Sequence, residues 1–225
     1  MAKKDTKITK KCPKCGAGAI KNSTVCIECG AKIKTSNGMG TVQPIRSKKD
    51  IESMKAYLKS KNIRDWALFV LGINSALRIS DLLNLNLTDV CDENGNIKDR
   101  IKLKEIKTGK TKDFPLNTNV KEALKEYIST VKDGQNVLFA SQKGNKAITR
   151  QHAHTILSSA AKTIGIKEAI SCHSLRKSFS FALYEAGVDI TRIQSLLNHS
   201  SPRETLRYIG IIQGELDEIY MELNL

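Results

Sequence analysis

The sequence predicts a mainly α-helical domain that contains one small antiparallel β-sheet, preceded by a small cysteine-rich module. Two observations predict the domain. Apolar residues recur at helical spacing through most of residues 47–223, and the spacing changes to a strand-like alternation between residues 101 and 116. A third observation, two Cys-x-x-Cys pairs close to the start of the chain, predicts the module.

Composition limits the class of protein. A chain of 225 residues that is 40% hydrophobic can form one or two domains with a real core. Its formal net charge of +14 favours a polyanionic partner, either nucleic acid or an anionic membrane surface. No apolar run approaches the roughly 20 residues of a membrane span. The lysine-rich start lacks the apolar core of a signal peptide. We therefore expect a cytoplasmic protein without a membrane partner.

The cysteine pairs are ten residues apart, and each is followed by a glycine that lets backbone N–H groups turn toward the sulfurs. Four thiolates at this spacing suit one tetrahedral Zn²⁺, although disulfides or redox-active pairs remain the alternative. The segment resembles a zinc ribbon of the rubredoxin-like kind, with a structural zinc on which its folding depends. The predicted zinc ligands are Cys12, Cys15, Cys26 and Cys29.

The predicted domains are a basic tail and zinc ribbon over 1–33, a flexible linker over 34–42, and the main domain over 43–225. The linker is assigned because the segment is polar and contains glycine. The tail lysines can neutralise phosphates, so the ribbon is expected to contact either DNA or another protein. These two roles stay open at this point.

Capping signals and periodicity predict the elements of the main domain in order. The expected N-caps are Ser47, Thr149, Asp189 and Ser201, the last with Pro202 at the first helical position and a capping box to Glu204. Helices are expected over 48–60, 63–75, 79–85, 118–131, 149–164, 174–187, 189–198, 202–209 and 213–223, and strands over 101–106 and 112–116. The last helix is amphipathic, so it either completes the core or docks on a neighbouring protomer.

Polar residues stand out against this apolar framework at four places. A cation and a carboxylate, Arg78 and Asp81, end a buried helix. One lysine lies at the hairpin tip, a His-x-x-Arg pair begins a helix, and a histidine and a tyrosine flank the start of the helix at 202–209. Taken singly, each has a structural explanation such as an ion pair, a solvated lysine, a helix cap or core packing. Their joint order carries more weight than any one of them.

That order resembles the signature boxes of the tyrosine recombinases, the phage-integrase family. The matching stretches are Ala76-Leu-Arg-Ile-Ser-Asp-Leu-Leu83, Lys107-Thr-Gly109, His173-Ser-Leu-Arg-Lys-Ser178 and Leu197-Asn-His-Ser-Ser-Pro-Arg-Glu-Thr-Leu-Arg-Tyr208, and the similarity covers residues 42–225. The resemblance implies the integrase catalytic fold and a site-specific recombinase of a mobile element. It also implies double-stranded DNA as partner and a homo-tetramer in the synaptic complex. The implied catalytic residues are Arg78, Lys107, His173, Arg176, His199 and Tyr208.

The implied roles agree with the residue types. The two arginines would hold the scissile phosphate, whose developing charge a guanidinium accepts bidentately. Tyr208 would attack, and because a free phenol has a pKa near 10, a base such as His173 must take its proton. Lys107 would protonate the leaving 5′ oxygen, with Lys110 or Lys112 as substitutes if the hairpin register differs.

The product of the cut would be a 3′-phosphotyrosyl link. No carboxylate cluster indicates bound Mg²⁺, so we expect catalysis without a cofactor. Two alternatives to a recombinase remain: a DNA-binding regulator that keeps the fold without turnover, and a type IB topoisomerase-like enzyme that relaxes supercoils.

Overall fold

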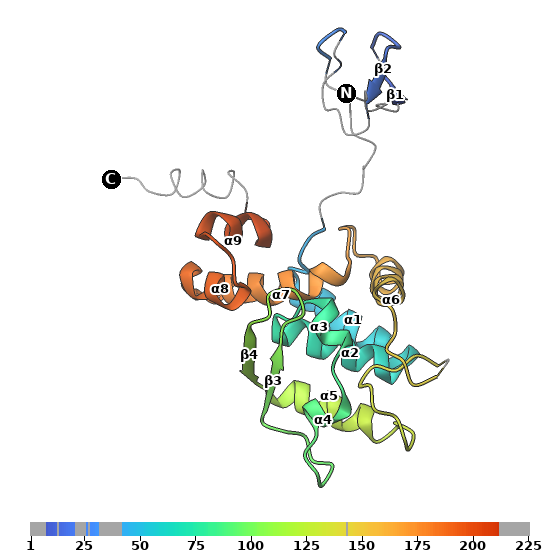
Figure 1. The fold of residues 1–225 in the computed structure, drawn as a ribbon, viewed down its shortest axis with the longest axis vertical. Coiled ribbons are helices and arrows are strands. Elements are labelled where there is room, and N and C mark those ends of the chain that lie inside the picture. The colour runs from blue at the N-terminus through green and yellow to red at the C-terminus, as the bar shows by residue number, and fades with distance from the viewer. Residues whose placement is uncertain are drawn as a thin grey trace, which may run out of the picture. The chain divides into compact units, whose positions relative to one another are not determined.

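A computed structural model describes residues 8–12, 14–20, 26, 28–31, 42–142 and 144–211 of the chain (Figure 1). The chain divides into two compact units, residues 1–41 and 42–225. The helix expected at 213–223 lies outside the described residues, as do most of the basic tail and most of the linker. Within the described part, no helix has the length and apolar character needed to cross a bilayer.

The first unit contains one two-stranded antiparallel ribbon, formed by β1 (Ile8–Lys11) and β2 (Gly18–Ile20). Both cysteine pairs make the same turn. Gly16 N–H donates to the Cys12 carbonyl and Gly30 N–H to the Cys26 carbonyl, each at 2.9 Å. These glycines have φ of 74° and 66°, a conformation that other residues adopt only with strain. The glycine after each pair therefore closes a tight turn around the sulfurs.

The described part of the second unit is helical with one β-hairpin. Its elements are α1 (Lys48–Lys61), α2 (Ile63–Ser75), α3 (Ile79–Leu83), α4 (Leu87–Val90), β3 (Arg100–Lys104), β4 (Thr111–Pro115), α5 (Thr118–Ile128), α6 (Arg150–Thr163), α7 (Cys172–Glu185), α8 (Ile190–Leu197) and α9 (Pro202–Ile209). The antiparallel register pairs Ile101 with Phe114 and Leu103 with Lys112. The predicted fold class, mainly α with a small antiparallel sheet, is confirmed.

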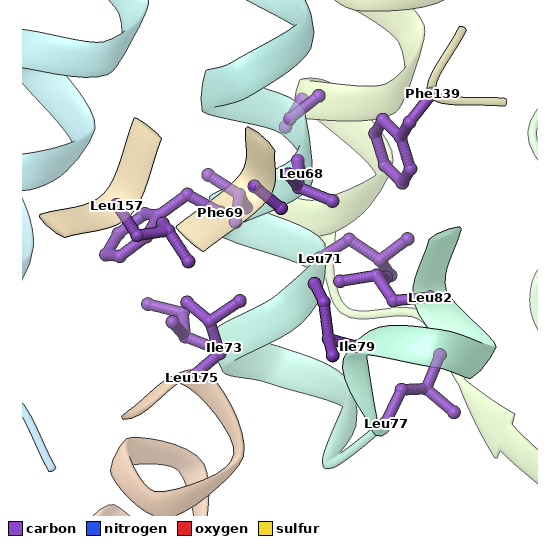
Figure 2. Packing of buried hydrophobic residues seen from close by; sticks show 14 of the residues in the cluster. Leu68, Phe69, Leu71, Ile73, Leu77, Ile79, Leu82, Phe139, Leu157 and Leu175 are labelled. Carbon is purple, nitrogen blue, oxygen red and sulfur yellow. The ribbon is translucent and has the colours of Figure 1, made fainter. Parts of the chain in front are cut away.

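The core is organised around α2, whose side chains are buried on almost every face. Leu68, Phe69 and Leu71 lie among residues from α3, α6, α7 and the segment around Phe139 (Figure 2). A Cβ atom at Gly72 would lie 2.6 Å from Leu175 Cδ1. Glycine at this position therefore lets α7 pack closely against α2, which brings the start of α7 near the end of α2.

The last helices pack at one end of this unit. Ile193 and Leu197 of α8 join a buried cluster with Ala76, at the C-terminal end of α2. Phe181 of α7 and Ile209 of α9 form a second cluster. Figure 1 shows α7, α8 and α9 grouped together, with the turn of the β3–β4 hairpin reaching toward them. Four segments far apart in the sequence thus meet at this end.

Several helix boundaries differ from the predicted ones. Helix α7 begins at Cys172 rather than 174, because Ser171 and Ser174 bond each other's backbone N–H groups in a capping box. The four-residue helix α4 was not predicted. Ser201 caps α9 as expected by accepting from Glu204 N–H. The Glu204 carboxylate, however, accepts from the backbone and hydroxyl of Ser200 and not from Ser201 N–H, so the predicted capping box is wrong in that half.

Candidate functional site

Two arginines meet where α2 ends. Arg78 is the N-cap residue of α3, and Arg176 lies in the second turn of α7 with only 4% of its surface exposed. Arg176 donates from Nη1 to the carbonyl of Ala76 and from Nη2 to the carbonyl of Leu197, each at 2.6 Å. Because these carbonyls end two different helices, they fix the position of the guanidinium.

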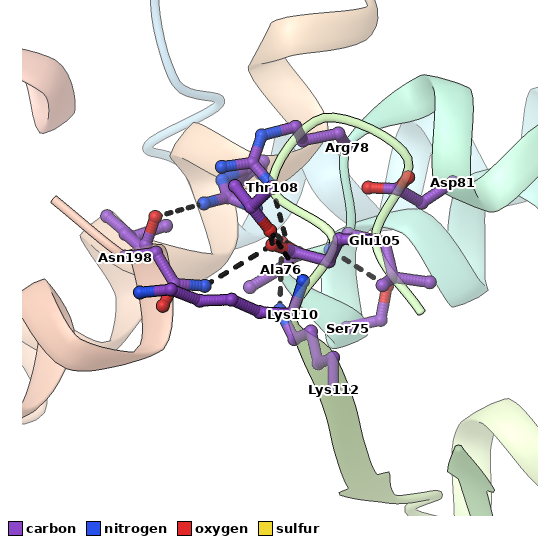
Figure 3. Close-up of polar contacts among 12 residues, drawn as sticks. Ser75, Ala76, Arg78, Asp81, Glu105, Thr108, Lys110, Lys112 and Asn198 are labelled. Carbon is purple, nitrogen blue, oxygen red and sulfur yellow. Dashed lines mark hydrogen bonds and ion pairs between the residues drawn. The ribbon is translucent and has the colours of Figure 1, made fainter. Parts of the chain in front are cut away.

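A buried carboxylate that we did not predict lies between the arginines. Glu105 is 1% exposed, and its Oε1 lies 2.8 Å from Arg78 Nη1 and 4.0 Å from Arg176 Nη1. Its Oε2 accepts from Thr108 Oγ1 at 2.6 Å and from Asn198 Nδ2 at 3.3 Å (Figure 3). Burial by itself raises the pKa of Glu105, but the Thr108 hydrogen bond and Arg78 outweigh it, so the pKa lies below its usual value.

A signal for Glu105 exists in the sequence. Residues 101, 103 and 105 share one face of an alternating strand, and Ile101 on this face is fully buried. A carboxylate at the next inward position must find partners or a shifted pKa. A charged residue that continues an apolar alternation is therefore the observation that could have indicated this position.

The hairpin lysines occupy different environments. Lys107 and Lys110 are exposed in the turn between β3 and β4. Lys112 is half-buried on β4, and its Nζ donates to the Ala76 carbonyl at 3.1 Å. Burial, followed by the positive charge of Arg176, lowers the pKa of Lys112 to about 8. Of the three lysines, Lys112 is the one that contacts the backbone holding Arg176.

Asp81 joins α3 to the hairpin turn and does not pair with Arg78. Its Oδ1 accepts from Ile106 N–H at 2.9 Å, and its Oδ2 is buried without a hydrogen-bond partner among the described residues. Arg78 pairs with Glu105 instead. The Asp81 carboxylate thus positions the turn that carries Lys107.

His173 lies at the second position of α7 and contacts an arginine that we did not predict. Its Nε2 lies 3.2 Å from Arg150 Nη2, on the first residue of α6. Partial desolvation of the imidazole, and then the positive charges of Arg150 and Lys177, lower the pKa of His173, although the residue as a whole is exposed. The imidazole is therefore neutral at neutral pH and able to accept a proton.

Tyr208 lies against His199 with their ring centroids 5.0 Å apart and the planes at 77°. Burial raises the pKa of the Tyr208 phenol, and Arg176 and Arg78 only partly oppose this effect. Burial also lowers the pKa of His199, whose Nδ1 lies 3.1 Å from Thr205 Oγ1. The phenol is therefore protonated at neutral pH and needs a base before it can act as a nucleophile.

Two residues beside this site have left-handed backbone conformations. Ala76 has φ of 51° and Asn198 has φ of 52°, and they are the only non-glycine residues with positive φ in the described part of the chain. Each is the C-cap of a helix, α2 and α8 respectively. Such conformations cost on the order of 1 kcal/mol for a non-glycine residue and occur preferentially at functional sites. Nothing in the alanine itself could have indicated this strain in the sequence.

The cysteines of the first unit form a cluster with the geometry of a metal site. All four Sγ atoms lie within 4.8 Å of one another. The distances are 3.7 Å from Cys12 to Cys29 and 3.6 Å from Cys15 to Cys26. A tetrahedral zinc with Zn–S bonds of about 2.3 Å requires sulfurs about 3.8 Å apart. The cluster can therefore hold a metal ion.

Comparison with known proteins identifies the family of the second unit. Residues 46–213 match the phage integrase family, which is most of the chain. The chain belongs to the phage integrase family. This confirms the family predicted for the main domain, while the matched range begins after the cysteine cluster, so no family match covers the predicted ribbon.

Among its relatives, this phage integrase family member is 44% identical over 173 residues to the probable integrase/recombinase YoeC of Bacillus subtilis, covering 77% of this chain and 92% of that protein. It is 34% identical over 166 residues to the tyrosine recombinase XerC of Thermodesulfovibrio yellowstonii, covering 70% of this chain and 53% of the relative. The chain thus spans almost the full length of the first relative and about half of the second.

Solved structures share the fold. The crystal structure of XerA recombinase matches with a TM-score of 0.65 and 22% identity, over 81% of this chain and 66% of that one. XerH site-specific recombinase in a post-cleavage complex with its palindromic difH substrate matches with a TM-score of 0.62 and 23% identity, over 86% of this chain and 58% of that one. The predicted integrase catalytic fold is confirmed by these similarities.

Proposed function

We propose that this chain is a tyrosine-type site-specific DNA recombinase of a mobile element, which cuts and rejoins double-stranded DNA through a covalent 3′-phosphotyrosyl intermediate. One observation carries the proposal: a partly buried phenol, Tyr208, lies within the electrostatic reach of two arginines at the end of α2. Relatives named as recombinases support the same activity. The basic composition, with a net charge of +14, suits a DNA partner.

In the proposed reaction, Tyr208 Oη attacks the scissile phosphorus and forms a new P–O bond, while the bond from phosphorus to the 3′ oxygen is kept. The P–O5′ bond breaks, and the 5′ oxygen leaves with a proton. Arg78 and Arg176 bind the nonbridging oxygens, whose negative charge grows in the transition state. A 5′ hydroxyl reverses the steps to rejoin the strand, so neither ATP nor a catalytic metal is needed.

Two histidines are candidates to accept the phenol proton. The family resemblance favours His173, and its lowered pKa keeps it neutral, as a base must be. The edge-to-face contact of His199 with Tyr208 makes His199 the second candidate. In either case the other histidine assists by donating to the phosphate.

Two lysines are candidates for the proton donor to the leaving oxygen. Lys107 holds this role by resemblance and lies on an exposed turn that DNA can approach. Lys112 is supported by its contact with the Ala76 carbonyl and by a pKa near 8, since an ammonium of lower pKa is the stronger acid. We propose Lys107 as the acid and keep Lys112 as the alternative.

A suicide-substrate assay tests the function. The probe is a nicked duplex built on a sequence that the protein itself selects from a random-sequence duplex pool. The wild-type chain is expected to form a covalent adduct that survives denaturing electrophoresis, and Tyr208→Phe is expected to form none. DNA binding without an adduct would indicate a non-catalytic regulator instead. Relaxation of supercoils without recombinant products would indicate a topoisomerase-like enzyme.

We further propose that the cysteine cluster holds one structural Zn²⁺ and that residues 1–33 form a zinc ribbon, joined by a linker over 34–42 to a catalytic domain over 43–225. The sulfur spacing near that of a zinc tetrahedron supports the choice of metal. The zinc would supply folding energy to a unit with few apolar residues and would take no part in catalysis. Elemental analysis of protein purified without added metal is expected to give about one zinc per chain.

We also propose that four copies assemble on two DNA sites as a homo-tetramer, because exchange between two duplexes requires four cleavages. Mass photometry with a duplex carrying the selected sequence tests this assembly. A species of four chains and two duplexes is expected, whereas complexes that stop at one duplex would contradict it.

A further inference from the structure

The Glu105 carboxylate is a buried charged group that the proposed reaction does not use. It is 1% exposed and contacts residues from four segments: the N-cap of α3, the hairpin turn, α7 and the C-cap of α8. A buried carboxylate is costly unless it is paired and hydrogen-bonded. Its buried position, directly after β3, is therefore stabilised because these partners converge on it (Figure 3).

We propose that Glu105 is a positioning residue for the arginine pair and that it sets the charge of the phosphate-binding site. This inference rests on the proposed function. The carboxylate pairs with Arg78 through Oε1, and its Oε2 accepts hydrogen bonds from Thr108 and Asn198. The hairpin turn, the α8–α9 connection and Arg78 are thereby held in one arrangement before DNA binds.

The need for such a residue follows from how differently the arginines are held. Arg176 is fixed by two backbone carbonyls, whereas the Arg78 side chain is 21% exposed and its Nη1 faces the Glu105 carboxylate. A long side chain without this partner would lose its preferred rotamer and with it the alignment with Arg176. Glu105 therefore fixes the position of the Arg78 guanidinium, as the carbonyls of Ala76 and Leu197 fix the position of the Arg176 guanidinium.

Charge gives the second part of the argument. Arg78, Arg176 and Lys112 are three cations, and Glu105 and Asp81 are two carboxylates in the same electrostatic neighbourhood. The Glu105 charge therefore offsets part of the positive charge of the arginines and Lys112. Removing the Glu105 charge would strengthen ground-state attraction to the phosphate without adding anything specific to the transition state. The expected signature is tighter or equal DNA binding together with slower cleavage.

The experiment separates binding from cleavage for Glu105→Gln. Equilibrium affinity is measured for the selected duplex with Tyr208→Phe in both backgrounds. The single-turnover rate of adduct formation is measured on the saturated suicide duplex. We expect the affinity to be unchanged or higher and the rate to fall by roughly tenfold or more, because misplacing a group that holds the phosphate costs on this order.

Asp113→Asn is the matched control. Asp113 lies on the same hairpin and pairs with Arg100 at 2.8 Å, but both side chains are about half exposed. It is expected to leave both quantities unchanged. Thr108→Val is the second variant, since it removes one hydrogen bond to Glu105 and keeps the carboxylate. It is expected to slow cleavage by a smaller factor than Glu105→Gln does. It also keeps the inference testable if the Glu105→Gln chain fails to fold.

The outcomes are distinct. An unchanged cleavage rate in folded Glu105→Gln, or a normal rate in Thr108→Val when Glu105→Gln does not fold, overturns the inference while the recombinase activity stands. A parallel loss of affinity and rate also overturns it, because it indicates a general loss of the site. If the wild-type chain itself forms no adduct, the proposed function fails first.

Discussion

Partial desolvation affects the protonation of the groups around Tyr208. It raises the pKa of the phenol, and it lowers the pKa of both His173 and His199. The proposed nucleophile therefore holds its proton at neutral pH while two neutral imidazoles are available to accept one. At the scale of residues, the site is arranged for general base catalysis more than for a preformed phenolate.

Replacing Arg150 by Gln tests which histidine acts. A base works only when neutral, so the cleavage rate falls as the pH drops through its pKa. The positive charge of Arg150 contributes to the low pKa of His173, so its removal raises that pKa and is expected to move the acid limb of the pH–rate profile to higher pH.

The control for this experiment is Arg192→Gln, an exposed arginine on α8. It is expected to leave the profile in place. An acid limb that does not move in Arg150→Gln would remove His173 from the role of base and favour His199.

Bridging-sulfur substrates identify the general acid. When sulfur replaces the 5′ bridging oxygen, the leaving thiolate needs no proton, so a chain that lacks only the acid recovers its cleavage rate. We expect Lys107→Ala to cleave normal DNA slowly, by a factor of about 10² or more, and to recover on the sulfur-containing duplex. Lys112→Ala is expected to show no such recovery, and the reverse pattern would assign the acid to Lys112.

The six catalytic candidates follow from their spacing in the family boxes and stay a prediction, whereas the partners of two of them could not be predicted. Glu105 is far in sequence from Arg78, and Arg150 from His173, and contacts between distant segments leave little trace in one sequence. The sequence could offer Lys112 only as an alternative proton donor to Lys107, because a one-residue change of hairpin register reverses which side chains point inward.

At the scale of elements, α9 is a short helix that carries the proposed nucleophile. Eight residues are too few for a stable isolated helix, so its order depends on caps and tertiary contacts. Ser201 supplies the N-terminal cap, and Ile209 anchors the other end in the cluster with Phe181. These two ends determine where the Tyr208 phenol points.

Ser201→Ala tests the cap. The loss of the hydrogen bond from Glu204 N–H is expected to lower the unfolding free energy by about 1 kcal/mol, and the melting temperature by about 2–4 °C, with slower cleavage because the helix start frays. Calorimetry and the adduct assay measure the two effects. Ser201→Asp keeps a capping oxygen and is expected to retain both the stability and the cleavage rate. Ser195→Ala, at an exposed position of α8, serves as a neutral control. An unchanged melting temperature in Ser201→Ala would contradict the role of the cap.

Helix starts could be predicted where a recognised capping residue precedes a periodic stretch, as for α1, α6, α8 and α9. The predicted start of α7 at residue 174 is wrong because Ser171 is the cap. Helix α4 is too short for periodicity to register. The left-handed turn at Ala76 depends on the arginine and lysine that bind its carbonyl, which lie far along the chain.

At the scale of the whole molecule, the two units are stabilised by different means. The second unit has a large apolar core around α2. The buried cluster of the first unit consists of Cys12 and Cys26 with small neighbours. The proposed Zn²⁺ would therefore contribute much of the folding energy of this unit.

A strong chelator is therefore expected to unfold the first unit alone. Calorimetry should lose the metal-dependent transition while the main transition stays in place, and Cys26→Ser should reproduce this result with less than one zinc per chain. Cys91→Ser is the control, because Cys91 lies outside the cluster. A main transition that moves with metal content would contradict the independence of the two units.

The most direct test of the central claim is the chemical identity of the DNA linkage. The covalent adduct is digested with nuclease and trypsin and analysed by mass spectrometry. Cleavage after Arg207 releases a peptide that begins at Tyr208 and also contains Tyr220, so fragmentation distinguishes the two phenols. We predict a nucleotide joined through its 3′ phosphate to Tyr208. A nucleotide on another residue, or one joined through a 5′ phosphate, would contradict the account.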